Sequence, residues 1–412
     1  MTEPESEGIN DLGMPKTTVH ESDDAGRTRR RFLRAAAAAG VVGVAGCNTP
    51  DETGGGTETE TETGSGGDAG NGGGDPEQIG SGRSPFGDRE VGGVTIEEMP
   101  DLEGELTVYS GRGEALVGEL VEFIGDQYPD LTIRPRYNTA AELVSQIETE
   151  GGNSPADVFY SVNAGALGTL ANRNRTRALP DDVLAFVPES FRDPDGQWIG
   201  TSGRARSVPF NTNAFSASDV PQDIMSFPDT DAFEGSVGWT PTYSSFQAFV
   251  TAMRILEGEE ATREWVNGML DLGVQTYSDE FQVSRAVADG EISVGLANHY
   301  YIQRVLARRS GAPISTAFTR NDAGAIFNVA GACVLDTASD STLASNFVRH
   351  LLSAEAQDYF ARSTFEYPLV PEVEPIGRLP TIDELNPPEG LDLSQLADLE
   401  ATISLLRETG AL

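Results

Sequence analysis

Residues 106–113 read Leu-Thr-Val-Tyr-Ser-Gly-Arg-Gly, a short apolar run followed by a glycine-containing turn. The apolar run predicts a β-strand, and the two glycines predict that the chain reverses after it. The spacing of apolar residues over 114–128 then predicts an amphipathic helix. This strand–turn–helix unit sets the pattern for the folded part of the chain, which we expect to begin near Leu102.

The same alternation continues directly downstream. A second strand is predicted over 131–137, and Thr139 followed by Glu142 is a capping-box signal for the next helix. A third strand over 157–161 leads into a helix over 164–172. Strands that alternate with helices indicate βαβ units on a mostly parallel sheet, so the predicted fold class is α/β.

Ligands of such sheets bind beyond the carboxyl ends of the strands, so Ser110–Glu114 and Ser161–Asn163 are expected at one rim. The extended segment Ser207–Thr212 is expected to cross to a second α/β set. Another apolar run, Ile326–Leu335, includes Cys333, which we expect to be a buried apolar residue. Ser394–Leu406 is predicted as a closing amphipathic helix.

The composition of the chain is strongly acidic, which bears on the functions that it can have. The 412 residues carry a formal charge of −37, and Lys16 is the only lysine among the 28 basic residues. A distributed acidic surface with almost no lysine favours solubility at high salt, and we interpret it as a sign of a halophilic source. Nucleic-acid binding is not expected, because it requires a basic surface.

The N-terminal segments predict export and membrane anchoring. Paired arginines within Thr28–Arg34 precede an apolar stretch of small residues, which is typical of a twin-arginine signal. The stretch ends Val-Ala-Gly-Cys at Cys47, which resembles a lipobox, where the cysteine receives lipid. The Gly-, Thr- and Glu-rich residues that follow Cys47 predict a solvated tether. We therefore expect a lipoprotein on the outer face of the cell membrane.

Enzyme motifs are missing. The chain has three histidines, and none accompanies a Gly-x-Ser-x-Gly nucleophile turn. HExxH, CxxC and P-loop motifs are also absent from the sequence. We therefore expect no enzymatic activity.

A different kind of site is suggested by Tyr300 and Tyr301, which follow an apolar run and precede an Arg-rich helical segment. Phenolate oxygen is a hard anionic ligand that suits a hard cation such as Fe(III). Neighbouring residues of a strand point to opposite faces, so both rings reach one ion only from a turn or a first helical turn, with Asn298 as cap. Adjacent aromatics are more often one buried and one exposed residue, so the pair alone does not define a site.

Five segments in register resemble ferric-iron-binding extracellular solute-binding proteins of ABC transporters, family 1 of the periplasmic-binding-protein type. Each motif is unspecific alone, whereas five in the same order and at similar spacing are strong together. The match runs from about residue 104 to the C-terminus. The five segments are Leu106–Arg112, Asn153–Ser161, Ser202–Arg206, Asn298–Tyr301 and Glu366–Leu369.

The resemblance implies a two-lobed type II fold that closes on its ligand by hinge motion. It implies a monomer that captures Fe(III) and delivers it to an ABC transporter permease. By resemblance Tyr300 and Tyr301 are the metal ligands. Asn298, with Ser244 and Ser245 at a helix start, would hold a synergistic anion such as carbonate, phosphate or citrate.

The expected division of the chain follows from this resemblance and from the N-terminal signals. The parts are a leader (1–27), a signal with lipobox (28–47), a tether (48–101), lobe 1 (102–208), lobe 2 (209–325), a return to lobe 1 (326–371) and a C-terminal segment packing on lobe 2 (372–412).

Two positions depart from the family pattern. Gly113 stands where many members carry a histidine ligand, and Val162 stands where they carry a glutamate. Glu114 and Tyr243 are candidate replacements, although a carboxylate at a helix start such as Glu114 is also simply favoured by the helix dipole.

Arginine forks offer a further way to complete the site. Arg112 and Arg204 are candidates to pair with a bound anion. A hinge salt bridge is the alternative role for Arg204 and also for Arg206.

Two other functions stay open at this level. The same fold could bind a small organic anion such as a phosphonate, a carboxylate or an iron chelate, which the replacements at Gly113 and Val162 favour. A secreted enzyme on this fold would use His299 as acid or base.

Overall fold

The computed structural model describes residues 79, 89, 91–397 and 399–412. The expected leader, twin-arginine signal, Cys47 and most of the tether lie outside the described residues. Across the described part of the chain, no helix is both long enough and apolar enough to cross a membrane.

The first lobe is built on the predicted parallel strands. β1 pairs in parallel with β2 on one side and with β3 on the other, which confirms the βαβ prediction. The capping box at α2 is also confirmed, since the Thr139 hydroxyl donates to Glu142 at 2.6 Å and accepts from its backbone N–H. The elements of this lobe are β1 (Gly104–Ser110), α1 (Glu114–Gln127), β2 (Leu131–Tyr137), α2 (Ala140–Glu150), β3 (Val158–Ser161), α3 (Ala164–Asn172), β4 (Thr176–Arg177), α4 (Asp181–Leu184), α9 (Ser341–His350), α10 (Ala354–Tyr359), β12 (Tyr367–Pro368) and α11 (Ile382–Leu385).

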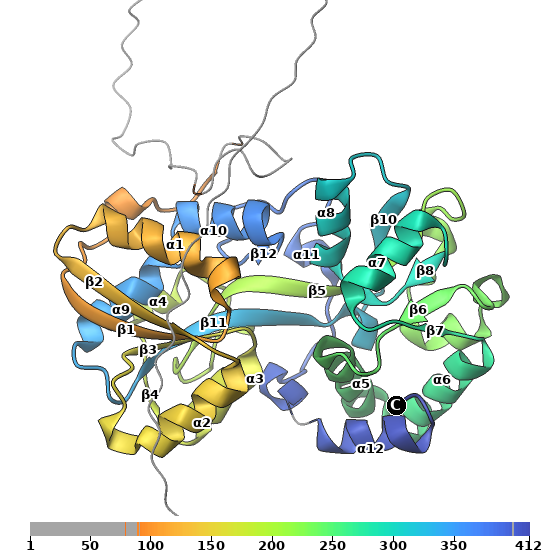
Figure 1. The fold of residues 1–412 in the computed structure, drawn as a ribbon, viewed down its shortest axis with the longest axis horizontal. Coiled ribbons are helices and arrows are strands. Elements are labelled where there is room, and N and C mark those ends of the chain that lie inside the picture. Colours follow the sequence, from red (N-terminus) through yellow and green to blue (C-terminus); the bar gives the residue numbers. More distant parts are fainter. Residues whose placement is uncertain (1–78, 80–88, 90, 398) are drawn as a thin grey trace, which may run out of the picture. The chain divides into compact units, whose positions relative to one another are not determined.

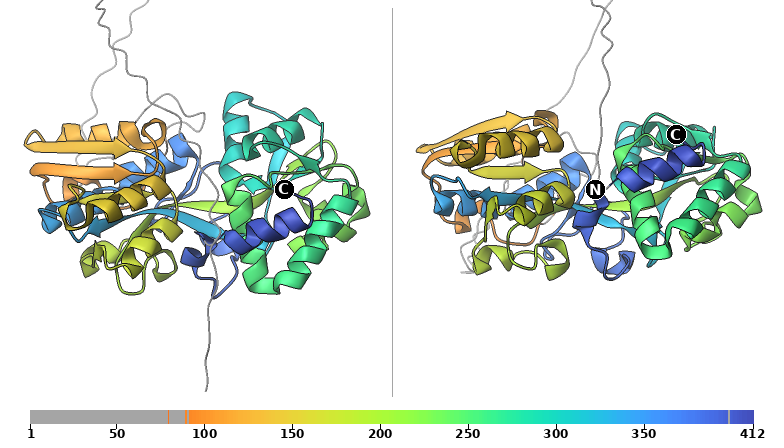
Figure 2. Two further views of the ribbon diagram at one scale, coloured as in Figure 1. Left: turned by 60° about the horizontal axis from the view of Figure 1, so that its bottom comes forward. Right: turned by 90° about the horizontal axis from the view of Figure 1, so that it is seen from below.

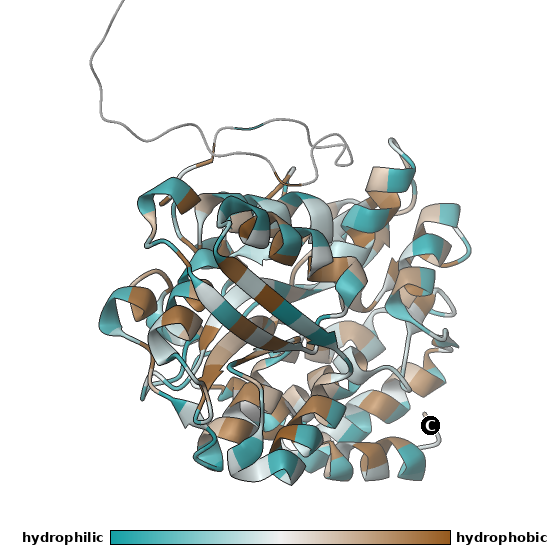
Figure 3. Cartoon of the chain, turned by 60° about the vertical axis from the view of Figure 1, so that its left-hand side comes forward, coloured by the Kyte–Doolittle hydropathy of each residue, from teal (hydrophilic) through white to brown (hydrophobic). Residues whose placement is uncertain are grey.

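The second lobe repeats the α/β arrangement on a smaller sheet. β6 lies between β7 and β8 and is parallel to both. Its helices, like those of the first lobe, carry an apolar and a polar side (Figure 3), as expected for helices that cover a sheet. The elements are β6 (Val237–Trp239), α5 (Ser244–Glu257), α6 (Glu259–Asp271), β7 (Gln275–Thr276), α7 (Glu280–Asp289), β8 (Val294–Gly295), β9 (Ala297–Asn298), α8 (His299–Arg308), β10 (Ile314–Ala317) and α12 (Glu400–Glu408).

Two long strands connect the lobes (Figures 1 and 2). β5 (Ile199–Asn211) and β11 (Phe327–Leu335) are antiparallel to each other. The first half of β5 pairs with β11, and its second half pairs with β8, β9 and β10 of lobe 2. The predicted crossing at Ser207–Thr212 is therefore confirmed, as the end of a strand that begins earlier.

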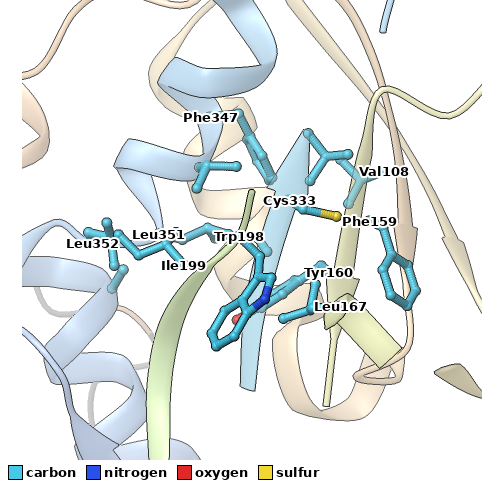
Figure 4. Packing of buried hydrophobic residues seen from close by; sticks show 14 of the residues in the cluster. Val108, Phe159, Tyr160, Leu167, Trp198, Ile199, Cys333, Phe347, Leu351 and Leu352 are labelled. Carbon is cyan, nitrogen blue, oxygen red and sulfur yellow. The ribbon is translucent and has the colours of Figure 1, made fainter. Parts of the chain in front are cut away.

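Each lobe has its own apolar core. Phe159, Trp198 and Cys333 belong to the core of lobe 1 (Figure 4), and Trp239 belongs to that of lobe 2. Cys333 is completely buried, as predicted, and burial raises the pKa of its thiol.

The C-terminal segment differs from the prediction in two ways. Val373 and Leu385 belong to the core of lobe 1, so the return to that lobe extends beyond residue 371. The single helix expected over Ser394–Leu406 is a 3-10 turn (Leu393–Ala397) followed by α12. The turn contacts both α3 of lobe 1 and α5 of lobe 2, whereas α12 packs on α5 (Figure 2). Apolar residues three apart, Leu393 and Leu396, suit the tighter 3-10 geometry.

Close approach of the connecting strands depends on Gly331, where the register of β11 against β5 shifts. A methyl group there would lie 2.4 Å from the Ile199 carbonyl oxygen and 2.9 Å from the Leu167 side chain. We predict that Gly331→Ala lowers the free energy of unfolding by about 1–3 kcal/mol through overpacking. Gly152→Ala, where a methyl group meets nothing within 4 Å, is the matched control and should be neutral or slightly stabilising. Thermal and urea unfolding of the two variants would check this, and equal stabilities would contradict it.

Candidate metal centre

Three tyrosine side chains meet in lobe 2. Tyr300 and Tyr301 lie in the first turn of α8, and Tyr243 is the residue before α5. The hydroxyls of Tyr243 and Tyr301 are hydrogen-bonded at 2.5 Å, and the ring centroids of Tyr300 and Tyr301 are 4.3 Å apart. Placement in a first helical turn is what lets neighbouring residues share one site, as the sequence indicated.

The surroundings of Tyr243 and Tyr301 favour the protonated forms of these two phenols. Burial raises the pKa of Tyr301, and the neighbouring Tyr300 and Tyr243 raise it further. Burial likewise raises the pKa of Tyr243. The guanidinium of Arg304 lies over both paired rings, 5.1 Å from the centroid of Tyr300 and 5.4 Å from that of Tyr301. A trivalent cation reverses this preference, because its charge favours the phenolate forms.

Oxygen donors of this kind distinguish the cluster from more common metal sites. Within the described residues no group of three or more His, Cys, Asp and Glu side chains is placed to hold a metal ion. The phenol oxygens of the three tyrosines are the candidate donor set, and they suit a hard cation.

A cavity of about 580 Å³ lies between the two lobes, beside this cluster. Lobe 1 contributes Val162 and Asn163 to its wall, and lobe 2 contributes Ser244 and Asn298. Among the described residues that line the cavity, none is one of the three tyrosines. The phenols lie behind the wall, where Tyr300 and Tyr301 are 8% and 6% exposed.

Asn298 connects the wall to the phenols. It precedes α8, as predicted, yet its side chain forms no capping hydrogen bond. Its amide instead lies 3.4 Å from the Tyr300 hydroxyl, to which it donates. Asn298 thus both lines the cavity and contacts Tyr300.

Arg204 also lines the cavity, from β5, and is partly buried there. Within the described chain Arg204 forms no ion pair with a hinge carboxylate, but its charge helps to lower the pKa of Glu366. Arg204 is therefore placed where an anion in the cavity would meet it.

Arg112 is not placed in the anion site, contrary to expectation. Its guanidinium is buried and donates to Glu366 at 2.5 Å and to the Ser202 hydroxyl at 2.6 Å. Burial alone would raise the pKa of Glu366, but the charges of Arg112 and Arg204 outweigh it and hold that pKa below its usual value. The guanidinium of Arg112 is therefore occupied within the fold. Its carboxylate partner, Glu366, lies 254 residues away in the chain.

Glu114 is not brought to the tyrosines either. It is exposed at the first position of α1 in lobe 1, where its charge and, more strongly, burial of the ring raise the pKa of Tyr137. Gly113 before it has φ of 70°, a conformation that glycine adopts readily.

Glu280 is a site residue that the sequence did not reveal. This buried carboxylate accepts hydrogen bonds from the Ser245 hydroxyl at 2.5 Å and from the Asn298 backbone N–H at 2.9 Å. It also forms an ion pair with Arg206. As the first residue of a helix, Glu280 resembles any carboxylate favoured by a helix dipole, so no local signal marks it.

His299, the candidate acid or base, is not among the described residues that line the cavity. It is fully buried, with Nδ1 next to the backbone of Ala205 and its ring 4.7 Å from that of Tyr367. Burial lowers its pKa to about 4.

Comparison with known proteins agrees with this fold. A model of the family described as bacterial extracellular solute-binding protein matches residues 153–382. The "Major ferric iron-binding protein" of Neisseria meningitidis is 31% identical over 320 residues, which is 74% of this chain and 93% of that protein. "Iron uptake protein A2" of Synechocystis is 31% identical over 248 residues, 57% of this chain and 71% of that protein.

Solved structures show the similarity of the fold directly. Iron-bound HitA from Pseudomonas aeruginosa superposes with a TM-score of 0.65 at 28% identity, covering 76% of this chain and all of HitA (100%). FutA from Trichodesmium, in complex with iron and citrate, gives 0.63 at 25% identity, covering 74% of this chain and 99% of FutA. The chain has the two-lobed periplasmic-binding-protein fold and belongs to the bacterial extracellular solute-binding proteins, which are binding proteins and not enzymes.

Proposed function

We propose that this protein captures ferric iron outside the cell and delivers it to the permease of an ABC transporter. The observation that carries the proposal is the meeting of three tyrosine side chains, Tyr243, Tyr300 and Tyr301, beside the interlobe cavity. Relatives named for ferric iron binding or iron uptake support it.

Capture proceeds by exchange of protons for the ion. The phenols lose their protons as Fe(III) binds, so affinity falls as the solution becomes more acidic. From lobe 1, Glu114 is exposed and its carboxylate can reorient when the lobes close. Water or a carbonate, phosphate or citrate ion would fill the remaining positions, held in the cavity by Arg204, Ser244 and the Asn298 side chain. Ser245, which was also expected at this anion, donates its hydroxyl to Glu280 instead.

We predict that Tyr300→Phe and Tyr301→Phe each weaken ferric binding more than the loss of a residue that only hydrogen-bonds a metal ligand. Such a loss costs roughly 10–100-fold in affinity. The reason is that each removes one anionic oxygen from the ion. The measurement is a ferric titration of the purified protein, followed by the visible absorption that phenolate-to-iron charge transfer produces. Tyr137→Phe in lobe 1 is the matched control and should retain the colour and the affinity. A colourless wild-type titration, or paired-tyrosine variants that behave like the control, would end the ferric proposal.

We also propose that the chain is exported by the twin-arginine route, anchored by lipid at Cys47 and held off the membrane by the 48–101 tether. The acidic, lysine-poor surface is consistent with a monomer that stays soluble in high salt. Family membership among extracellular proteins supports export.

The anchor has a direct test. Cys47→Ala removes the only thiol that the lipobox offers for lipid, so the protein should move from the membrane fraction to the medium. Cys333→Ala is the control and should stay with the membrane, because that thiol is buried in lobe 1. Unchanged membrane association of Cys47→Ala, by fractionation and immunoblot, would contradict lipid anchoring.

A small organic anion is the second candidate ligand. The cavity of about 580 Å³ has room for one, and its wall includes Arg204 and the starts of α2, α3 and α5. Helix starts and a guanidinium both favour negative charge. Calorimetry of the metal-free protein with citrate or a simple phosphonate separates the two functions. Ferric capture predicts no tight binding without iron, whereas tight metal-free binding would favour the organic anion.

A further inference from the structure

Glu280 lies at the meeting point of all the elements that carry the phenols. It is the first residue of α7 and is completely buried. Its Oε1 atom accepts from the Ser245 hydroxyl at 2.5 Å, and its Oε2 atom accepts from the Asn298 backbone N–H at 2.9 Å. Arg206 of β5 completes the set as an ion-pair partner of Oε1.

These partners stand next to the candidate ligands in the chain. Ser245 is two residues beyond Tyr243, and Asn298 is two residues before Tyr300. One carboxylate therefore ties the start of α5 to the start of α8. Tyr243 and Tyr301 meet across these two helix starts, so Glu280 joins the elements that carry them.

Glu280 is also the anion that the surrounding donors require. Within the described residues, Nε and Nη2 of Arg206 have no hydrogen-bond partner, and the guanidinium lies over the rings of Phe246 and Phe249. Removing one member of a buried ion pair leaves an uncompensated charge, which is strongly unfavourable. The site therefore needs a negative group at this point in order to hold its shape.

We propose that Glu280 is a resident anion that positions the three phenols, so that assembly of the ferric site does not require an added oxyanion. The proposal rests on the ferric function proposed above and names the residue that prepares the site for the ion. An exogenous carbonate, phosphate or citrate would then be an auxiliary ligand in the cavity. It would not be a partner of the Ser245 hydroxyl or the Asn298 N–H, which Glu280 occupies.

The wild-type protein provides the first test. Ferric titrations of the full chain are compared in bicarbonate-depleted buffer with and without inorganic phosphate, using the visible charge-transfer band. We expect the apparent affinity to change by less than about threefold, far below the roughly 10–100-fold effect of an outer-shell partner. A gain of about tenfold or more with phosphate would overturn the resident-anion proposal while leaving ferric capture intact. No colour in either buffer would overturn both.

Chemical rescue provides the second test. Glu280→Ala leaves a buried space facing Arg206, Ser245 and Asn298, which a formate ion can enter. We expect ferric affinity to fall by about tenfold or more and the charge-transfer band to shift, as the phenols lose their alignment. Added formate should restore the affinity, the band position and the melting temperature, and it should leave the wild type unchanged.

Asp279→Ala is the matched control for this rescue. Asp279 precedes Glu280 and caps α7 through the Gln282 N–H at 2.9 Å, but its capping bond holds none of the three donors around Glu280. It should lose some stability, keep the wild-type absorption band and show no response to formate. Should Glu280→Ala fold poorly, the formate dependence of its melting temperature still reports the site. A Glu280→Ala protein that binds iron like the wild type, or that formate does not rescue, would overturn the proposal.

Discussion

The antiparallel pairing of β5 with β11 is the constraint on which the rest of the structure depends. Both strands continue from one lobe toward the other, so the two sheets share their connection. β5 also carries Arg204 on the cavity wall and Arg206 in the ion pair with Glu280, while the backbone of Ala205 contacts His299 at the start of α8. A single strand therefore contributes to the connection between the lobes, to the cavity wall and to the surroundings of the tyrosine cluster.

The chemistry of the site follows from an unequal division between the lobes. Lobe 2 supplies every phenol of the cluster, together with Asn298 and Glu280. Lobe 1 supplies the facing wall through Val162 and the start of α3. The positions of Gly113 and Val162, which lack ligating side chains, agree with a lobe that covers a site and adds little to its donor set.

Local signals in the sequence predicted local structure well. β2 has the bounds expected from its apolar pattern, and the Thr139–Glu142 capping box forms as expected. The tyrosine pair also lies in a first helical turn, where Asn298 precedes it. Each of these features depends on residues close together in the chain, so periodicity and capping rules were sufficient.

Partners far apart in the chain could not be predicted in this way. Arg112 was expected at the anion site but pairs with Glu366, 254 residues away, and Arg206 pairs with Glu280, 74 residues away. Nothing in the sequence around either arginine identifies its carboxylate, because many acidic residues are available. The break between the 3-10 turn and α12 was missed for a related reason, since Leu393 and Leu396 pack across two lobes and not along one helix face.

The concentration of phenols on lobe 2 has a consequence for unloading. If ferric iron is the cargo, swinging lobe 1 away exposes the ion without breaking a bond to Tyr243, Tyr300 or Tyr301. Separation of the lobes then gives access to the ion but does not release it. The slow step at the transporter is ligand substitution at the metal, in which the phenolates are protonated and competing oxygen donors replace them one after another.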